Sequence, residues 1–535
     1  MSIRRLLVVG LDAATFDVID PLVEAGDLPN LAGLLERGAR GTLRSTTHPL
    51  TPLAWTTMVS GVNAGRHGIW DFSERDASGY GLRLVNGSHS RAPAIWTRLS
   101  AAGRKVGVVN VPFTWPAPEV NGFALAGMDA GAREDGMTSP RELVGELQDR
   151  FGRLLLDHTF PVDERGLLDL DLVRRQCEQK VAIVDWLAER YDPELLFVVF
   201  MTADHVHHLA WPDWEARGRE SIVAEAYRIL DASLGRLLER TSEDTNVLVV
   251  SDHGGGALRG VINLNAWLAE QGYLAYADGS SNGGGAHKVF ELRRKLPKEW
   301  RYSLKQRLPW LRERAYRLKK PSVVDWSHTR AFAYGIFGNV VLNVAGRERD
   351  GVVEPGEEYE QLRNELRERL LDLRSEDGER IVAAVHRRED LYAGPELDRI
   401  PDLIIEFRDY AWLGKGNLTQ RTPTLADTIT VRTHPSQRYA GGHRPDGILV
   451  LAGPDARPGS ELQAGIADVA PTLMYLLGEP VPAAFEGRLL AEALQPSLLD
   501  ERPLEYSDDE LVAPLDEHES PREVEERLRS LGYLE

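Results

Sequence analysis

The segment Val247–Gly256 constrains the fold more than any other part of the sequence. Four aliphatic residues and a serine precede Asp252 and His253, and three glycines follow. A short apolar run bounded by turn residues is typical of a strand buried on both faces, as in the interior of a parallel sheet. Ligands of open α/β sheets bind beyond the carboxyl ends of the strands, where this acid and imidazole lie. Oxygen and imidazole nitrogen atoms are suitable donors for a divalent metal ion such as zinc.

Two other apolar runs end in the same way. Leu6–Leu11 is followed by Asp12, and Leu195–Ala203 is followed by Asp204. A single Asp after a strand is an ordinary turn residue or helix cap. Three acid-tipped strands, however, bring three carboxylates to one edge of a sheet. The sequence therefore predicts a metal site at that edge.

Histidines supply the nitrogen ligands that such a site needs. If a helix begins after the third strand, His208 lies four residues beyond Asp204 on the same helical face. A helix cap followed by a core histidine would have the same spacing. His443 follows two glycines and precedes a buried strand, so it is the best candidate for a further ligand. Spacing alone leaves three competitors in place: His48, His67 and His434.

The count of candidate ligands is one short of a complete two-metal site. Two roughly tetrahedral ions, one with an open position, need about seven protein ligands. We therefore expect the nucleophile itself to be the seventh. The six candidates are Asp12, Asp204, His208, Asp252, His253 and His443.

Apolar runs alternate with helical patterns along the chain, which predicts an α/β fold with a doubly wound, mostly parallel sheet and helices on both faces. Further strands are expected at 105–111 and 447–453. The sheet is expected to resume with strands at 331–335 and 339–343, and a further strand is expected at 402–407. The expected helices cover 22–37 (broken at Pro29), 52–60, 141–150, 168–191, 220–240, 357–373 and 466–477.

The length of 535 residues predicts more than one structural unit. We expect a catalytic α/β domain formed by residues 1–275 and 325–490, a basic insertion or lid at 276–324, and an acidic C-terminal tail at 491–535. A Gly- and Ser-rich linker at 277–286 opens the insertion, and residues 287–320 are rich in Lys and Arg interleaved with aromatic residues. This basic stretch suits a packed insertion, a lid or a membrane-surface contact.

The formal net charge of −19 argues against nucleic acid as a partner, because phosphate backbones are bound by clustered Lys and Arg. A small phosphorylated substrate needs only a few local cations. The single cysteine, Cys177, forms no intramolecular disulfide and no thiolate cluster. The apolar run after Met1 is too short for a signal peptide, and no apolar span reaches about 18 residues, so we expect a cytoplasmic protein. The sequence does not indicate an oligomeric state.

Five ordered motifs between residue 5 and about residue 480 resemble the alkaline phosphatase superfamily and, within it, the type I phosphodiesterase/nucleotide pyrophosphatase family. The motifs are Gly-Leu-Asp12, the Thr51–Ile69 segment with its Ser-Gly61 and His67-Gly68 pairs, Asp204 with His208, Ser-Asp252-His253-Gly254, and Gly-Gly-His443.

The resemblance implies two divalent ions of the zinc class, with manganese as another candidate, and Thr51 as the nucleophile. Asp12, Thr51, Asp252 and His253 would hold the ion beside the nucleophile, and Asp204, His208 and His443 would hold the other. The implied reaction is cleavage of phosphodiester or pyrophosphate bonds through a covalent phosphothreonine. On position alone, Thr51 also suits an ordinary helix cap.

One departure bears on the substrate. Nucleotide-cleaving members carry an Asn shortly after the Gly-Ile pair, whereas this chain has Trp70-Asp71-Phe72. Cys177 lacks the setting of a sulfatase nucleophile. A phosphomonoesterase, a phosphonate hydrolase and a phospho-headgroup transferase of the same superfamily remain alternatives, as does a metal-bearing binding protein without turnover.

Overall fold

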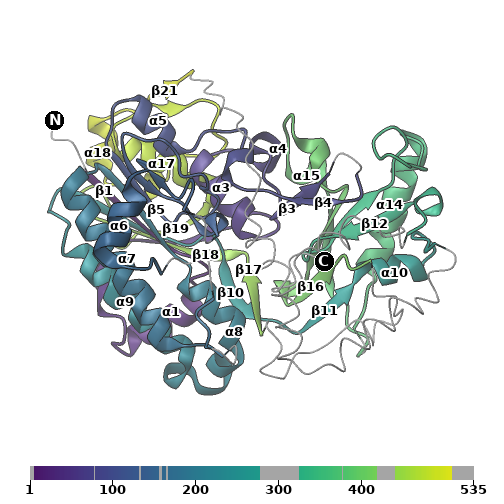
Figure 1. The fold of residues 1–535 in the computed structure, drawn as a ribbon, viewed down its shortest axis with the longest axis horizontal. Coiled ribbons are helices and arrows are strands. Elements are labelled where there is room, and N and C mark those ends of the chain that lie inside the picture. The colour runs from purple at the N-terminus through teal and green to yellow at the C-terminus, as the bar shows by residue number, and fades with distance from the viewer. Residues whose placement is uncertain are drawn as a thin grey trace.

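The computed structural model describes residues 5–76, 79–131, 134–155, 160–163, 167–277, 324–375, 377–418 and 440–508. These residues form two lobes, which lie side by side (Figure 1). The larger lobe is built on a sheet that has nine strands within the described ranges. In spatial order they are β19 (Glu461–Gly465), β2 (Gly38–Arg44), β18 (Asp446–Ala452), β9 (Thr245–Val250), β1 (Arg5–Leu11), β8 (Leu195–Phe200), β5 (Val106–Val109), β6 (Gly122–Leu125) and β7 (Thr138–Ser139).

The central strands are apolar on both sides because both faces of the sheet are covered. Leu7 and Val9 of β1 pack into one hydrophobic core, while Leu6 and Val8 pack into a second core on the opposite face. Successive side chains of a strand point to opposite faces, so a strand with two buried faces needs an unbroken apolar run. This is the pattern that the sequence shows.

Parallel pairing predominates among the central strands. β1 pairs in parallel with β8 and β9, and β5 pairs in parallel with β6 and β8. β18 runs antiparallel to both of its neighbours, β2 and β9, and β7 runs antiparallel to β6. The predicted α/β fold with a mostly parallel sheet is therefore confirmed.

Helices cover both faces of this sheet, and in Figure 1 they lie above and below the strands. One core receives α1 (Phe16–Glu24), α2 (Pro29–Arg37), α6 (Leu143–Phe151), α7 (Leu170–Tyr191), α8 (Thr202–Arg217) and α9 (Ile222–Leu238). The other core receives α3 (Thr51–Ser60), α5 (Ile95–Ala101), α17 (Val469–Leu476) and α18 (Pro496–Glu501), and the short α4 (Ala64–His67) follows α3.

The second lobe has a sheet of its own. Its four strands are antiparallel and enclose a separate hydrophobic core. The expectation that strands near 331 and 339 resume the central sheet is therefore wrong, and the strand near 402 lies beside them. They form this second sheet instead, in the order β12 (Ala331–Tyr334), β13 (Asn339–Leu342), β15 (Leu403–Phe407) and β14 (Val382–Arg387), with α10 (Leu264–Glu270), α14 (Glu357–Leu371) and α15 (Arg388–Leu391) beside it.

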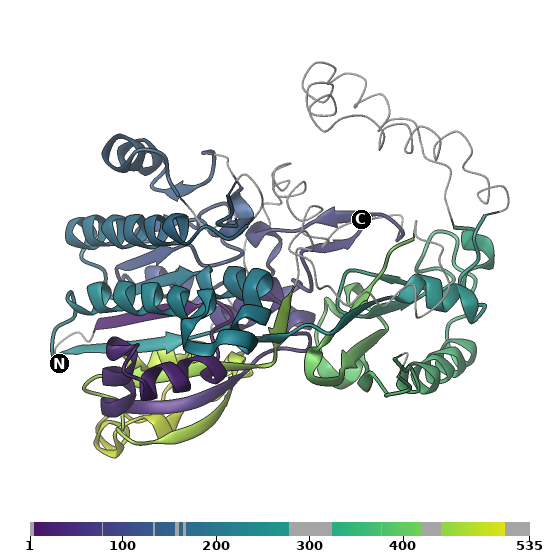
Figure 2. The ribbon, with the colours of Figure 1, turned by 90° about the horizontal axis from the view of Figure 1, so that it is seen from below.

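Small two-stranded sheets complete the fold. Both views place β10 and β17 between the two lobes (Figures 1 and 2). The pairs are β10 (Gly254–Ala257) with β17 (Gly441–Arg444), β11 (Gly260–Asn263) with β16 (Trp412–Lys415), β3 (Ser73–Arg75) with β4 (Leu82–Leu84), and β20 (Val481–Pro482) with β21 (Tyr506–Ser507).

Most of the predicted basic insertion, with its linker and residues 287–320, lies outside the described residues, as do His434 and residues 509–535. Residues 491–508 pack against the larger lobe, where Ala493, Leu494 and Leu498 are buried. The domain boundaries at 276, 324 and 491 stay predictions. In the part of the chain that the structure describes, no helix is long and apolar enough to cross a membrane.

Candidate metal centre

Three acids lie together at the carboxyl edge of the central sheet because their strands are adjacent and in register. Gly10 of β1 is paired with both Val199 of β8 and Val250 of β9. The amide of Asp12 donates to the carbonyl of Phe200 over 3.0 Å, and the amide of Asp204 donates to the carbonyl of Asp12 over 3.1 Å. All three acids are buried.

The first cluster, the oxygen-rich group, consists of Asp12, Thr51, Asp252 and His253. The imidazole Nε2 of His253 lies 3.4 Å from Oδ2 of Asp252 and 3.8 Å from Oδ1 of Asp12. The hydroxyl of Thr51 lies 3.3 Å from the same nitrogen. Four donor atoms from three separate parts of the chain therefore face one point.

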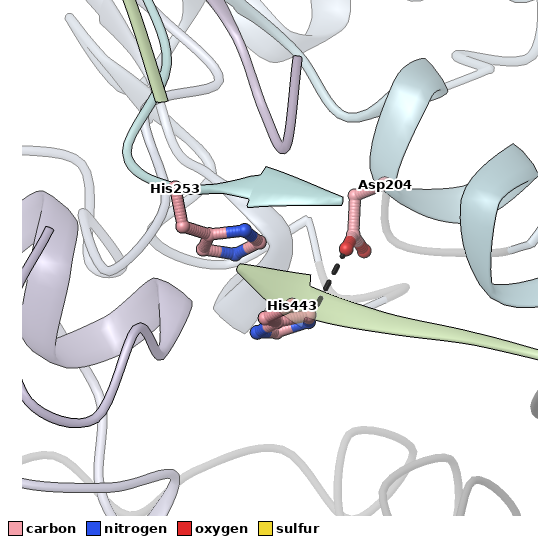
Figure 3. A group of neighbouring side chains, drawn as sticks. All are labelled: Asp204, His253 and His443. Atoms are coloured by element: carbon pink, nitrogen blue, oxygen red, sulfur yellow. Dashed lines mark ion pairs between the residues drawn. The ribbon is translucent and has the colours of Figure 1, made fainter. Parts of the chain in front are cut away.

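The second cluster, the nitrogen-rich group, consists of Asp204, His208 and His443. Oδ1 of Asp204 lies 3.2 Å from Nε2 of His208 and 3.4 Å from Nε2 of His443. The two Nε2 atoms are 3.1 Å apart. The His253 and His443 rings stack at 3.9 Å between centroids, so the two groups adjoin each other (Figure 3).

A backbone carbonyl fixes the orientation of each imidazole. Nδ1 of His253 faces the carbonyl of Gly254 at 3.0 Å, Nδ1 of His208 faces that of Gly441 at 3.0 Å, and Nδ1 of His443 faces that of Pro49 at 2.7 Å. A carbonyl oxygen only accepts, so Nδ1 carries the proton in all three rings. Each Nε2 then presents a lone pair to the site, the arrangement that metal-binding histidines adopt.

The donor set fits two cations. Oδ1 of Asp12, Oδ1 of Asp204 and Oδ2 of Asp252 are buried without a hydrogen-bond partner among the described residues. Such atoms are costly unless something compensates them. The Nε2 atoms of His208 and His443 also face each other and the Asp204 carboxylate, so without an ion one of them must carry a proton. A divalent ion in each group would satisfy both the carboxylate oxygens and the imidazole nitrogens.

Electrostatics differ between the two groups. Burial, followed by the charges of Asp252 and Asp204, raises the pKa of Asp12 well above its usual range. Burial and then Asp204 likewise raise the pKa of Asp252. Burial also opposes ionisation of Asp204, but the adjacent His208 and His443 outweigh the effect of burial and lower the pKa of Asp204. The oxygen-rich group thus holds two acids that resist ionisation, and the nitrogen-rich group holds one that favours it.

Glycine makes room where β10 and β17 cross α8. Gly255 pairs with His443 in the register of these strands. A Cβ atom on Gly255 would lie 2.1 Å from Nδ1 of His207, closer than any real contact. The glycines after His253 therefore allow the helix that carries His208 to approach the strand that carries His443.

Thr51 occupies the first position of α3, after the cap residue Leu50. The cap makes no side-chain hydrogen bond to the helix, and the Thr51 hydroxyl is directed at His253 instead. Residues near a helix N-terminus offer free amides and a favourable dipole to an anion. The side chain of Thr51 thus joins the oxygen-rich group and does not cap the helix.

Two competing histidines lie outside both groups. His67 is buried with Nε2 at 3.0 Å from the Thr57 hydroxyl, and its Nδ1 accepts from the amide of Ile69. His48 is buried in an aromatic cluster whose Phe337 ring, 5.5 Å away, also lies 5.5 Å from His443. Burial lowers the pKa of His48 and of His67 to about 3, so both are neutral at pH 7.

The structure also adds a contact that the sequence analysis missed. Nε1 of Trp55 donates to Oδ2 of Asp12 over 2.8 Å. The spacing of four residues between Thr51 and Trp55 was the available signal, because it places both side chains on one face of a helix.

Comparisons with known proteins place these features in a family. The model of the type I phosphodiesterase / nucleotide pyrophosphatase family matches residues 6–437. A sequence comparison with curated proteins finds no match. The similar solved structures include murine ectonucleotide pyrophosphatase/phosphodiesterase 5, which is 14% identical at a TM-score of 0.49 and covers 92% of this chain and 100% of the murine chain.

Phosphonoacetate hydrolase from Sinorhizobium meliloti 1021, solved with phosphonoformate, is 16% identical at a TM-score of 0.53. The alignment covers 89% of this chain and 96% of the hydrolase, and it shows a shared fold. The family match spans well over half of the sequence and includes all but one of the predicted site residues. This chain therefore belongs to the type I phosphodiesterase/nucleotide pyrophosphatase family.

Proposed function

We propose that this protein is a two-metal hydrolase that cleaves phosphodiester or pyrophosphate bonds through a covalent phosphothreonine at Thr51. One observation carries the proposal. Six acidic and imidazole side chains and the Thr51 hydroxyl converge at the carboxyl edge of the sheet, with the hydroxyl 3.3 Å from Nε2 of His253. The family supports hydrolysis of phosphoesters.

The oxygen-rich group would hold one divalent ion beside the nucleophile, and the nitrogen-rich group would hold the other. Zinc is the best match for both groups because it accepts imidazole nitrogen together with carboxylate oxygen, and manganese is an alternative. When bound, two such ions supply charge that stabilises the attacking and leaving oxygens of an in-line displacement.

Thr51 performs the covalent step in this proposal. A threonine hydroxyl is a poor nucleophile at neutral pH and needs activation. Its hydroxyl gives up its proton to solvent as the oxygen attacks phosphorus, the bond from phosphorus to the leaving oxygen breaks, and the leaving group departs as an alcohol or a phosphate that takes up a proton from solvent. The remaining phosphoryl group is then carried on Thr51. Water then attacks the phosphothreonine, releases the phosphate product and restores the hydroxyl. The amino end of α3 faces the charge that develops on the phosphoryl oxygens.

The substrate is a small phosphorylated molecule, and a nucleotide is not implied. Phe72 stands within the stretch where nucleotide-cleaving members carry an Asn, and its buried ring packs against Phe113 with centroids 5.8 Å apart. A phenylalanine donates no hydrogen bond to a phosphoryl oxygen. This stretch contains no Asn, so a preference for nucleotides does not follow from the resemblance.

The test is an activity screen after reconstitution with zinc or manganese, using generic diesters, pyrophosphates, monoesters, phosphonates and sulfate esters. We expect the fastest turnover on diesters or pyrophosphates. Preference for a monoester or a phosphonate, or headgroup transfer to an acceptor alcohol, would select one of the alternative activities. No turnover on any of them, with two ions bound, would favour a metal-bearing binding protein.

The nucleophile is tested separately. Thr51→Ala should fold normally and lose turnover by about 10³-fold or more, while Thr51→Ser should retain part of it. Acid quenching during turnover, followed by mass spectrometry, should find a phosphoryl group on Thr51. A phosphoryl group on another residue would exclude this assignment. A cytoplasmic location also stays a prediction, which fractionation of cells would check.

A further inference from the structure

We propose that Trp55 is a positioning residue that fixes the carboxylate of Asp12 and the nucleophile Thr51 relative to each other. The inference rests on the proposed function, because it assigns Trp55 a role at the oxygen-rich group. Trp55 touches neither of the reacting atoms, and it acts through Asp12.

The hydrogen bond from the Trp55 indole gives the two carboxylate oxygens of Asp12 different roles. Nε1 of Trp55 donates to Oδ2 over 2.8 Å, whereas Oδ1 is buried with no hydrogen-bond partner among the described residues. Oδ1 is also the oxygen that lies 3.8 Å from Nε2 of His253. A hydrogen bond to one oxygen fixes the rotation of the carboxylate, so the other oxygen stays directed at the centre of the oxygen-rich group.

The same helix face carries the nucleophile. Thr51 and Trp55 are the first and fifth residues of α3, so they lie one turn apart on one side of the helix. The helix thus contacts the oxygen-rich group twice, through the Thr51 hydroxyl at His253 and through the Trp55 indole at Asp12. These two contacts set the height and rotation of α3 over the end of β1.

The indole itself is held rigidly. Trp55 is fully buried, and its ring packs edge-on against Phe197, with centroids 6.1 Å apart. On β1 a Cβ atom at Gly10 would lie 2.5 Å from Cη2 of Trp55, so only glycine leaves space for the ring at that position. The absence of a side chain at Gly10 therefore leaves room for the Trp55 ring, which explains why glycine stands two residues before Asp12.

A purely structural role predicts something different. If Trp55 only filled the core, its replacement by an aromatic ring without an N–H group would alter stability and leave the affinities for both ions unaffected. If it positions Asp12, the same change should weaken one ion selectively. Hydrogen-bond partners of metal ligands contribute about 10- to 100-fold to metal affinity.

The experiment compares Trp55→Phe with Trp96→Phe in the full-length protein. Trp96 is the matched control because it is also buried in this core and also packs against Phe197, with centroids 6.2 Å apart. Zinc is titrated into each metal-free protein against a chromophoric chelator. We expect Trp55→Phe to weaken the binding of one zinc ion about 10- to 100-fold and to leave the affinity for the other within twofold of the unaltered protein. Trp96→Phe should change neither affinity.

Equal affinity of Trp55→Phe and the unaltered protein for both ions would overturn the inference. If Trp55→Phe fails to fold, incorporation of benzothienylalanine at position 55 replaces the N–H by sulfur at nearly the same shape. Unchanged affinities there would overturn it equally. Failure of the unaltered protein to bind two ions would instead contradict the proposed function, so the two failures are distinguishable.

Discussion

The two ligand groups adjoin each other but are built in different ways. The oxygen-rich group draws Asp12 and Asp252 from the ends of the neighbouring strands β1 and β9, where the sheet register alone brings them together. The nitrogen-rich group joins His208 of α8 to His443 of β17, which are 235 positions apart. The register of the sheet brings the acids of the oxygen-rich group together, whereas the nitrogen-rich group requires the packing of a helix against a glycine-rich strand pair.

Their electrostatics differ in the same sense. Burial and mutual repulsion raise the pKa values of Asp12 and Asp252, whereas the two histidines lower the pKa of Asp204 in spite of its burial. Without an ion, the oxygen-rich group is therefore strained by like charges, and the nitrogen-rich group already contains a favourable pair. We therefore expect the oxygen-rich group to lower the stability of the metal-free protein more than the nitrogen-rich group does.

The largest expected effect separates the two ions. Asp252→Asn should remove the ion of the oxygen-rich group, and His208→Ala and His443→Ala should each remove the other ion. All three should lower turnover by about 10³-fold or more, because each ion stabilises one side of the displacement. Elemental analysis of protein purified without chelator should find two ions per chain in the unaltered protein and about one in each variant.

Retention of two ions and full activity by His443→Ala would show that His443 is not a ligand. A variant that loses both ions at once would show that the two groups form one cooperative site.

The second expected effect concerns the metal-free protein and has opposite signs in the two groups. Asp204→Asn breaks a buried pair with His208 and should lower the free energy of unfolding by about 3–5 kcal/mol. Asp252→Asn removes a repelled acid and should raise it by about 0.5–2 kcal/mol at pH 7. Urea unfolding in the presence of a chelator measures both changes.

The pH dependence follows from the directions of the shifts. The pKa of Asp204 is lowered, so its contribution is present above the unfolded value near 3.9 and is lost as the pH falls below it. The pKa of Asp252 is raised, so stability declines as the pH rises above the unfolded value, and the gain from Asp252→Asn should grow over that range. Changes of the same sign in both variants would contradict this contrast.

A smaller effect should appear in metal preference. Imidazole nitrogen favours zinc over manganese, whereas carboxylate oxygen suits manganese. The nitrogen-rich group should therefore bind zinc at least about 10-fold more tightly than the oxygen-rich group does. Stepwise removal by a chelator should release the ion of the oxygen-rich group first, and Asp252→Asn should lack that early step. If the first ion is still released early from Asp252→Asn, that ion belongs to the nitrogen-rich group, and the expected order of release is wrong.

The sequence predicted the proximity of the three acids for a physical reason. Strands buried on both faces leave a clear apolar signature, and parallel strands deliver the residues after them to one edge. Asp12, Asp204 and Asp252 were recognisable from that pattern alone. The choice of His443 over His48 or His67 needed the family resemblance, since no spacing rule links residues so far apart.

Other features were beyond the sequence pattern. The strands near 331, 339 and 402 are as apolar as those of the central sheet, so periodicity gave no sign that they form a second sheet. The apolar pattern also missed β2 and β19, because Gly38–Arg44 alternates between glycine, alanine and polar residues and pairs at the edge region of the sheet. The Trp55 contact depends on how close α3 lies to β1, which composition does not encode.

The smallest expected effect tests whether the two groups are complete. His67 lies outside both of them, and the Ile69 amide donates to its Nδ1, so its Nε2 carries the proton and donates to Thr57. It therefore has no lone pair to offer an ion. His67→Gln should leave two ions bound, with affinities within twofold, and should cost about 1 kcal/mol of stability at pH 7.5 through the lost hydrogen bonds.

That cost should shrink as the medium becomes acidic. Burial lowers the pKa of His67 to about 3, below its ordinary value of 6.5, so the unfolded chain binds a proton that the folded protein does not. The stabilisation that His67 contributes to the unaltered protein is therefore lost as the pH falls below 6.5. Glutamine does not titrate, so the variant has no such loss. Urea unfolding at pH 7.5 and pH 5 should show the difference between the two proteins diminishing or reversing, with metal content constant. A loss of either ion from His67→Gln would place this histidine within the site and require the ligand groups to be redrawn.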